Sequence, residues 1–138
     1  MTSRWQQLGI DIDHMVRTVL EEVPLHPDVP SQAGRPYLTV YQIAIRLDAR
    51  FPEVRRALGS DVEVGGRDIG VHHSLASRLG QYLVASVKSP DNHDIEGAVI
   101  SPAHVAAFEF TGSDRNRIRS SLPEAGLPHW IFRLRRGL

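Results

Sequence analysis

The sequence predicts a single α+β domain in which three main helices precede a small antiparallel sheet. The chain has 138 residues, the usual length of one domain. Before residue 89, apolar residues recur at helical spacing in three segments. After residue 95, apolar residues alternate with other residues in the manner of strands. We therefore expect a helical part over about 3–88 and a β-rich part over about 95–136.

Composition and charge narrow the class of protein. Sixteen Lys and Arg residues balance sixteen Asp and Glu residues, so the chain as a whole is not a strongly basic nucleic-acid binder. The charge is unevenly placed, with a net of −3 over residues 1–30 and +4 over residues 114–138. Cysteine is absent, and we find neither a membrane-spanning apolar run nor a signal peptide. We expect a cytoplasmic protein with no membrane contact and no cofactor.

The first helix is expected between Ser3 and Glu22. Its apolar stripe consists of Ile12, Met15, Val16, Val19, Leu20 and Val23. A glycine inside a helix costs about 1 kcal/mol relative to alanine, so Gly9 leaves open a start at Asp11 or Asp13 as N-cap. The segment 23–36 holds four prolines and is expected to be a long loop.

The second helix carries a clear start signal. Thr39 and Gln42 have the spacing of a capping box, and Val40, Ile43, Ala44, Leu47 and Phe51 form the stripe. A short helix over 52–58 should follow, with Pro52 in its first turn and Gly59 at its end. Tyr41 and Ile45 lie on another face, which is more apolar than a solvated face should be.

A glycine-rich segment over 59–70 leads into the third helix. Val62, Val64 and Ile69 are compatible with a short strand or hairpin that turns at Gly65-Gly66. The helix is expected over 71–88, with apolar residues four apart and an opposite face that lacks acids. The three stripes should be buried together, and the expected core is Val16, Leu20, Ile43, Ala44, Leu47, Leu75, Leu79 and Leu83.

The C-terminal part predicts strands. The segments 95–100 and 105–110 alternate as two strands of a hairpin joined by 101–104, and 111–126 is polar, with arginine at every second position over 115–119. A last strand over 130–136 should place Trp130, Phe132 and Leu134 on one face.

Two phrases of the chain resemble winged helix-turn-helix DNA-binding domains. The phrase LTVYQIAIRL at 38–47 resembles the first helix of that motif, and SLASRL at 74–79 resembles the start of its recognition helix. The resemblance covers about residues 38–110 and implies a DNA-binding module, in transcription control or as the targeting part of a larger system. Double-stranded DNA is the expected partner, with a homodimer or larger protein assembly as a further possibility.

The helix over 71–88 would then enter the major groove, with nearby residues on the DNA backbone. The candidate DNA-binding residues are Arg67, His72, His73, Ser74, Ser77, Arg78, Gln81, Asn92, His93, Arg133 and Arg135. A metal at His72-His73 is disfavoured, because neighbouring helical residues point about 100° apart. The start of this helix is instead expected to meet phosphates or bases.

Two other classes stay open. A protein–protein adaptor would use Tyr41 and Ile45, or an exposed edge strand near the C-terminus. An enzyme is the third reading, because Asp94, Glu96, His104 and Glu109 could serve a small metal-dependent nuclease. The segment 65–70 lacks the lysine of a Walker motif, and no nucleophile elbow or zinc motif is present.

Overall fold

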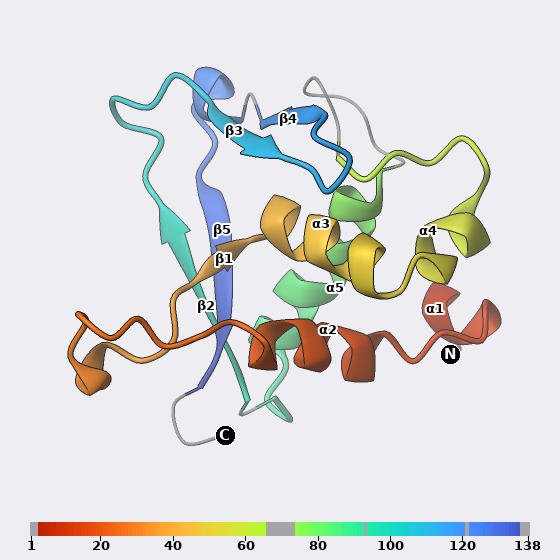
Figure 1. Cartoon of the computed structure of the whole chain (residues 1–138), viewed down its shortest axis with the longest axis horizontal. Helices are drawn as coiled ribbons and strands as arrows, with labels where there is room; N and C mark the ends of the chain where they lie inside the picture. The colour runs from red at the N-terminus through yellow and green to blue at the C-terminus, as the bar shows by residue number, and fades with distance from the viewer. Residues whose placement is uncertain (1–2, 66–73, 93, 121, 136–138) are drawn as a thin grey trace.

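The structure, a computed structural model, describes residues 3–65, 74–92, 94–120 and 122–135. Within these ranges the chain is a mixed α+β protein with small antiparallel sheets (Figure 1). The α-helices are α1 (Arg4–Gln7), α2 (Ile12–Glu21), α3 (Val40–Arg50), α4 (Glu53–Leu58) and α5 (Leu75–Lys88). The strands are β1 (Leu38–Thr39), β2 (Ile95–Ile100), β3 (Phe108–Thr111), β4 (Arg117–Ser120) and β5 (His129–Leu134). Two short 3-10 helices, η1 (Ser31–Ala33) and η2 (Leu122–Ala125), lie in the connections.

Local signals account for the helices. The first predicted helix is divided at Gly9, whose φ of 73° is the left-handed conformation that favours glycine. Asp11 caps α2 by accepting from the amide of His14, as the alternative start predicted. The capping box of α3 is formed by Thr39 and Gln42, and Gly59 ends α4 with a φ of 150°.

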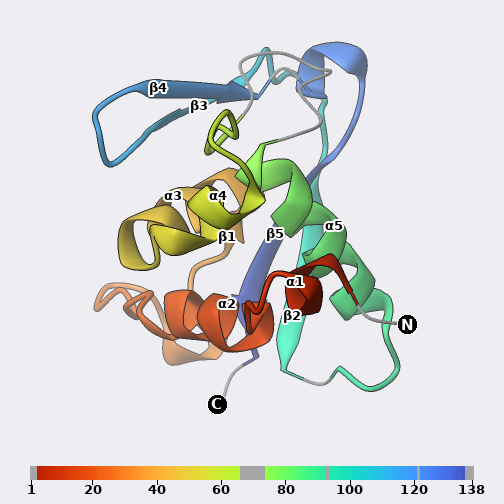
Figure 2. The same cartoon turned by 90° about the vertical axis from the view of Figure 1, so that its right-hand side faces the viewer.

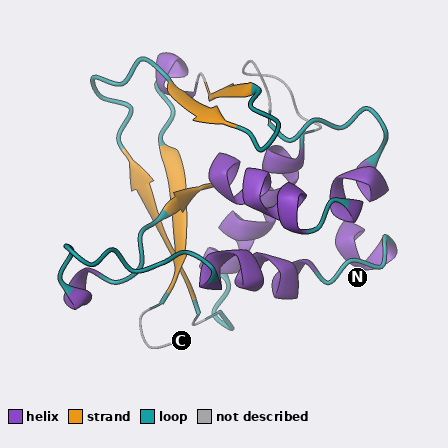
Figure 3. Ribbon diagram, viewed as in Figure 1, coloured by secondary structure: helices purple, strands orange, loops and turns teal. Residues whose placement is uncertain are grey.

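Three helices pack on one face of the three-stranded sheet, as the ribbon diagram shows (Figure 3). Helix α3 contacts both α2 and α5, while α5 lies against β2 and α2 against β5. The eight residues of the expected core are all buried, with Leu79 fully inaccessible, so the phasing of the three helices is confirmed. From β5, Phe132 and Leu134 join the same core.

The strands do not pair as neighbours in sequence. The sheet has the order β1-β5-β2, with Ile95 opposite Leu134 and Ile100 opposite His129. Between β2 and β5 the chain leaves this sheet and forms the two-stranded sheet β3-β4, which we call the basic hairpin (residues 108–120). The expected hairpin of 95–100 with 105–110 is therefore wrong. Because β5 is paired on both sides, the C-terminal strand is not an edge strand, and the edges of this sheet are the two-residue β1 and the six-residue β2.

The described part of the glycine-rich segment is not a strand. Residues 59–65 form turns and irregular chain, so Val62 and Val64 do not lie in a strand, while 66–70, with Ile69, lie outside the described residues. The carbonyl oxygens of Glu63 and Val64 accept hydrogen bonds from the first two amides of α5. Among the described residues, no helix is both long and apolar enough to cross a lipid bilayer.

Candidate nucleic-acid interface

The start of α5 is occupied by the chain's own atoms. The amides of Leu75 and Ala76 each donate to a backbone carbonyl, of Glu63 and Val64 respectively, at 2.8 Å. The third amide, of Ser77, donates to the hydroxyl of Ser74 at 3.0 Å, and Ser74 is buried as the N-cap. A helix binds a phosphate through these free amides. The first amides of α5 are therefore not available to a phosphate, and His72 and His73, where the phosphate or base contact is expected, lie outside the described residues.

Farther along α5, beyond its covered first turn, several side chains are exposed to solvent. Gln81, Ala85 and Lys88 are exposed and Ser77 is half-buried, with no acidic residue anywhere in the helix. Arg78 is half-buried and lines a recess of about 220 Å³ that it shares with Arg4, Leu58, Asp61 and Val62. Of the predicted contacts on this helix that the structure describes, Gln81 is therefore the exposed one.

The basic hairpin lies above α3. One face of the hairpin carries Phe108, Phe110, Ile118 and Ser120, and the other carries Glu109, Thr111, Arg117 and Arg119. The first face packs on the protein, where Ile118 and Ser120 are buried, and the second face points to solvent. Figure 2 shows the hairpin extending over α3, while α5 runs away from it toward the opposite side. Most of α5 therefore lies on a different side of the molecule from the tip of the hairpin.

Two arginines of the hairpin are available to an external anion. Arg115 and Arg117 are exposed, and no acid in the described part of the chain lies at ion-pair distance from either. The turn that presents them is ordered, because the amide of Gly112 donates to the carbonyl of Asn116 at 2.8 Å and Asp114 accepts from the Asn116 amide at 3.0 Å. Arg46, on α3 beneath the hairpin, is likewise exposed without a described acid partner.

An aromatic cluster holds the hairpin on α3. Tyr41 stacks on Phe110 with ring centroids 5.5 Å apart, and His129 meets Phe108 edge to face at 4.8 Å. Nε2 of His129 lies 3.1 Å from the Ser120 hydroxyl and Nδ1 lies 3.4 Å from the Trp130 carbonyl, which acts as acceptor for an Nδ1 proton. Burial lowers the pKa of His129, and the contact with the Trp130 carbonyl opposes this only in part.

The basic hairpin partly covers Tyr41 and Ile45, the two residues that a protein–protein adaptor would use. Tyr41 is half-covered by the hairpin, and Ile45 lines a cleft of about 270 Å³ between α3, residues 63–65 and the turn of the hairpin. In this cleft Arg55 is held by Asp48 at 2.9 Å and by the carbonyl of Val62 at 3.2 Å. Tyr41 and Ile45 therefore do not form the exposed apolar patch that the adaptor alternative requires, because residues far along the chain fold over them.

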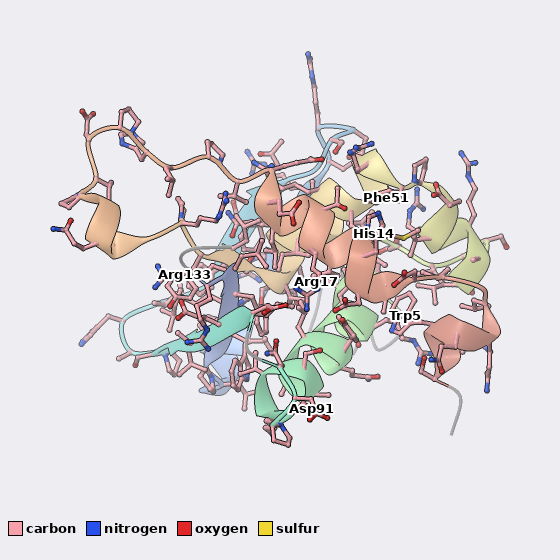
Figure 4. All side chains as sticks on the ribbon, turned by 90° about the horizontal axis from the view of Figure 1, so that it is seen from below. Trp5, His14, Arg17, Phe51, Asp91 and Arg133 are labelled. Carbon is pink, nitrogen blue, oxygen red and sulfur yellow. The ribbon has the colours of Figure 1, made fainter. Side chains whose placement is uncertain are left out.

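Other predicted DNA contacts turn out to hold the fold together. Arg133 donates through Nε to Glu96 at 2.7 Å and through Nη1 to the carbonyls of Ala33 and Arg35, and its guanidinium lies 4.3 Å from the centre of the Tyr37 ring. Figure 4 shows Arg133 between the sheet and the segment that carries η1. Arg133 is therefore a structural contact.

Asn92 and Arg135 also have partners within the chain. Asn92 accepts from the amide of Ile95 at 3.2 Å and donates to its carbonyl at 3.1 Å. Arg135 is exposed but lies 3.3 Å from Glu96. Four predicted contacts, Arg67, His72, His73 and His93, lie outside the described residues.

The acids of the nuclease reading do not assemble into a metal site. Asp94 is paired with Arg17 and Glu96 with Arg133, while Glu109 is exposed on the hairpin opposite Arg119. Among the described residues, no group of three His, Cys, Asp or Glu side chains is placed to hold an ion.

Comparison with protein-family models, with curated proteins and with the solved structures found no match to this chain. The support for the candidate interface therefore comes from the geometry of this chain. The sequence offered one signal for the hairpin, because Arg115, Arg117 and Arg119 alternate with the period of a strand. The sequence itself predicts only that 111–126 is polar, because Ile118 is the one apolar residue among 115–119.

Proposed function

We propose that this chain is a DNA-binding domain of winged-helix type, in transcription control or as the targeting part of a larger system. The basic hairpin, rather than the start of α5, is its main contact with duplex DNA. The observation that carries this proposal is the exposure of Arg115 and Arg117 on an ordered turn, without an acidic partner among the described residues. Guanidinium groups bind phosphate through paired hydrogen bonds, and phosphate contacts supply much of the affinity for DNA.

The fold supports the winged-helix part of the proposal. The capped helix α3 is followed along the chain by α5 and then by the antiparallel strands β2 and β5. Strand β1 belongs to the same sheet as these two strands. The basic hairpin extends the connection between β2 and β5, which is the position of a wing. Fold alone does not establish function, so the arginines of the hairpin have to be tested directly.

The decisive experiment measures binding of a labelled mixed-sequence duplex by fluorescence anisotropy at several salt concentrations. The double variant Arg115→Ala/Arg117→Ala should bind more weakly, and the slope of log affinity against log salt should fall by about 2, one for each lost phosphate contact. Arg50→Ala is the matched control, because Arg50 is also exposed but is paired with Glu22 at 2.9 Å. Its salt dependence should remain that of the unmodified protein.

A further variant distinguishes the hairpin from the recognition helix. Gln81→Ala removes an exposed polar side chain of α5 and should leave the affinity for DNA nearly unchanged, because α5 and the hairpin tip lie on different sides. If Gln81→Ala lowers the affinity for DNA more than Arg115→Ala/Arg117→Ala does, the main contact is α5 and not the hairpin. Absence of binding by the unmodified protein at low salt would end the proposal altogether.

A further inference from the structure

Strand β2 is an open edge of the three-stranded sheet. Its inner side pairs with β5 along its whole length, and Figure 1 shows no further strand beyond it. An exposed edge offers unpaired backbone groups to another strand, and proteins usually block it with charges, proline or covering elements. How far β2 is blocked therefore decides what it can bind.

The hydrogen-bond pattern identifies the groups that face outward. The amide of Arg135 donates to the carbonyl of Asp94 at 2.6 Å, which makes this a hydrogen-bonded pair of the ladder. In an antiparallel ladder such pairs alternate, so Glu96, Ala98 and Ile100 are bonded to β5. The backbone groups of Ile95, Gly97 and Val99 consequently point away from the sheet.

One of these three positions is blocked within the chain. The side-chain amide of Asn92 accepts from the Ile95 amide and donates to the Ile95 carbonyl, so it mimics a neighbouring strand there. In the described part of the chain, no hydrogen bond reaches the outward groups of Gly97 or Val99. The open part of the edge is therefore short and lies around Ala98.

We propose that β2 pairs with β2 of a second copy of this chain, antiparallel about a two-fold axis at Ala98. In this register Gly97 of one copy faces Val99 of the other, and each pair exchanges two backbone hydrogen bonds. The unpaired backbone groups of Gly97 and Val99 in one copy are thus the groups that bond to Val99 and Gly97 of the other copy. The result is a continuous sheet across both molecules, with the order β1-β5-β2 in each half.

Side chains along the edge favour the same occupant. Val99 is 52% exposed, and it would lie beside the partner's Gly97, which has no side chain of its own. Behind Gly97, Val87 and Trp130 form an apolar surface, since a Cβ at Gly97 would lie 3.0 Å and 3.1 Å from their atoms. A valine set beside this surface loses its exposed area to an apolar neighbour.

Charge raises no obstacle to the pairing. Residues 97–100 carry no charged side chain, and the nearest acid on the strand, Glu96, is already paired with Arg133 at 2.7 Å. A two-fold axis at Ala98 therefore brings no unpaired like charges together along the edge. This pairing does not use the hairpin arginines, because β2 belongs to the three-stranded sheet and Arg115 and Arg117 belong to the separate sheet β3-β4 and its turn.

A cross-linking experiment tests the register. The chain has no cysteine, so Ala98→Cys introduces a single thiol at the axis. Residues opposite each other at a non-hydrogen-bonded position have Cα atoms about 4.5 Å apart, within the range of a disulfide. Ala98→Cys should form a disulfide-linked dimer rapidly in mild oxidant, whereas Ala49→Cys, at an exposed position on α3, should not. Equal rates of cross-linking for the two variants would overturn the register.

A second experiment tests the edge without new covalent chemistry. Sedimentation equilibrium in the absence of DNA should show a dimer of the unmodified protein, and Val99→Lys should raise the dissociation constant by at least about tenfold. Val29→Lys, which changes another exposed valine in the loop before η1, should have no effect. A monomer at every protein concentration, or equal weakening by both lysines, would overturn the proposal.

Discussion

At the scale of the residue, His129 is the side chain on which the two sheets meet. It belongs to β5, is only 1% exposed, and bonds to Ser120 of the basic hairpin while Tyr41 and Phe108 enclose its ring. Burial favours the neutral ring and lowers its pKa from the ordinary value of 6.5. Below that value the unfolded chain takes up a proton that the folded chain does not. Stability supplied by a neutral His129 must therefore fall as the pH decreases.

His129→Gln should remove this part of the pH dependence. The free energy of unfolding of the unmodified protein should decrease as the pH falls below about 6.5, because the unfolded state then binds more protons. The variant should be less stable at neutral pH and should show a flatter profile below it. Urea denaturation at a series of pH values measures both. His26→Gln, in an exposed loop, should keep the profile of the unmodified protein, and identical profiles for all three would contradict the assignment.

At the scale of the element, α3 is the helix that joins the sheet to the helical layer. Thr39 ends β1, where it lies opposite Ile131, and caps α3 by accepting from the Gln42 amide at 3.2 Å. The Thr39 amide in turn donates to Oε1 of Gln42 at 2.7 Å, and Thr39 is buried. The capping box thus sets the angle at which α3 leaves the sheet, and α3 carries Tyr41 to the hairpin.

Thr39→Ala should lower the free energy of unfolding by about 1 kcal/mol, the usual cost of losing an N-cap. Ser3→Ala removes the same type of capping box from α1, which has four residues and lies at the exposed N-terminal end. Its cost should be smaller, because few packed residues depend on that helix. Chemical denaturation of the two variants side by side provides the comparison. A larger loss for Ser3→Ala would show that the cap of α3 does not organise the fold.

At the scale of the whole molecule, a few long-range ties connect the layers. Tyr82 of α5 donates to Asp13 of α2 at 2.8 Å, and burial together with this bond raises the pKa of Tyr82 to about 12. Arg17 of α2 pairs with Asp94 just before β2 (Figure 4). Arg133 anchors the long loop over 24–36 to the sheet through the carbonyls of Ala33 and Arg35. These contacts hold α2, α5, the start of β2 and the loop over 24–36 together, although the segments are distant in sequence.

Arg133→Met should release the loop over 24–36 while the helical core remains folded. Methionine keeps the apolar stem but donates no hydrogen bond to the loop carbonyls or to Glu96. Hydrogen exchange should accelerate in this loop and in β2, and should change little in α3 and α5. Arg56→Met is the control, because Arg56 is exposed and has no described ion-pair partner. Faster exchange across the whole chain would indicate global destabilisation instead of a local tie.

The helices and their buried faces follow from local patterns in the chain. The capping box at Thr39, the N-cap at Asp11, the glycine at the end of α4 and the apolar stripe through Leu79 each act within a few residues, so the sequence alone identified them. The inward face of β5 was predicted for the same reason. Such patterns show which face of an element is buried, but they contain nothing about what covers it.

Tertiary structure decided the pairing of strands and the use of the surfaces. Backbone hydrogen bonds between strands are the same for any residue, so the sequence did not reveal that β2 pairs with β5 or that β3 pairs with β4. The cover over Tyr41, the carbonyls at the start of α5 and the partners of Arg133 all come from segments distant in sequence or from loops. The candidate site is the hairpin instead of α5, because contacts between segments distant in sequence decide which amides and side chains remain free to bind DNA. No local sequence pattern contains that information.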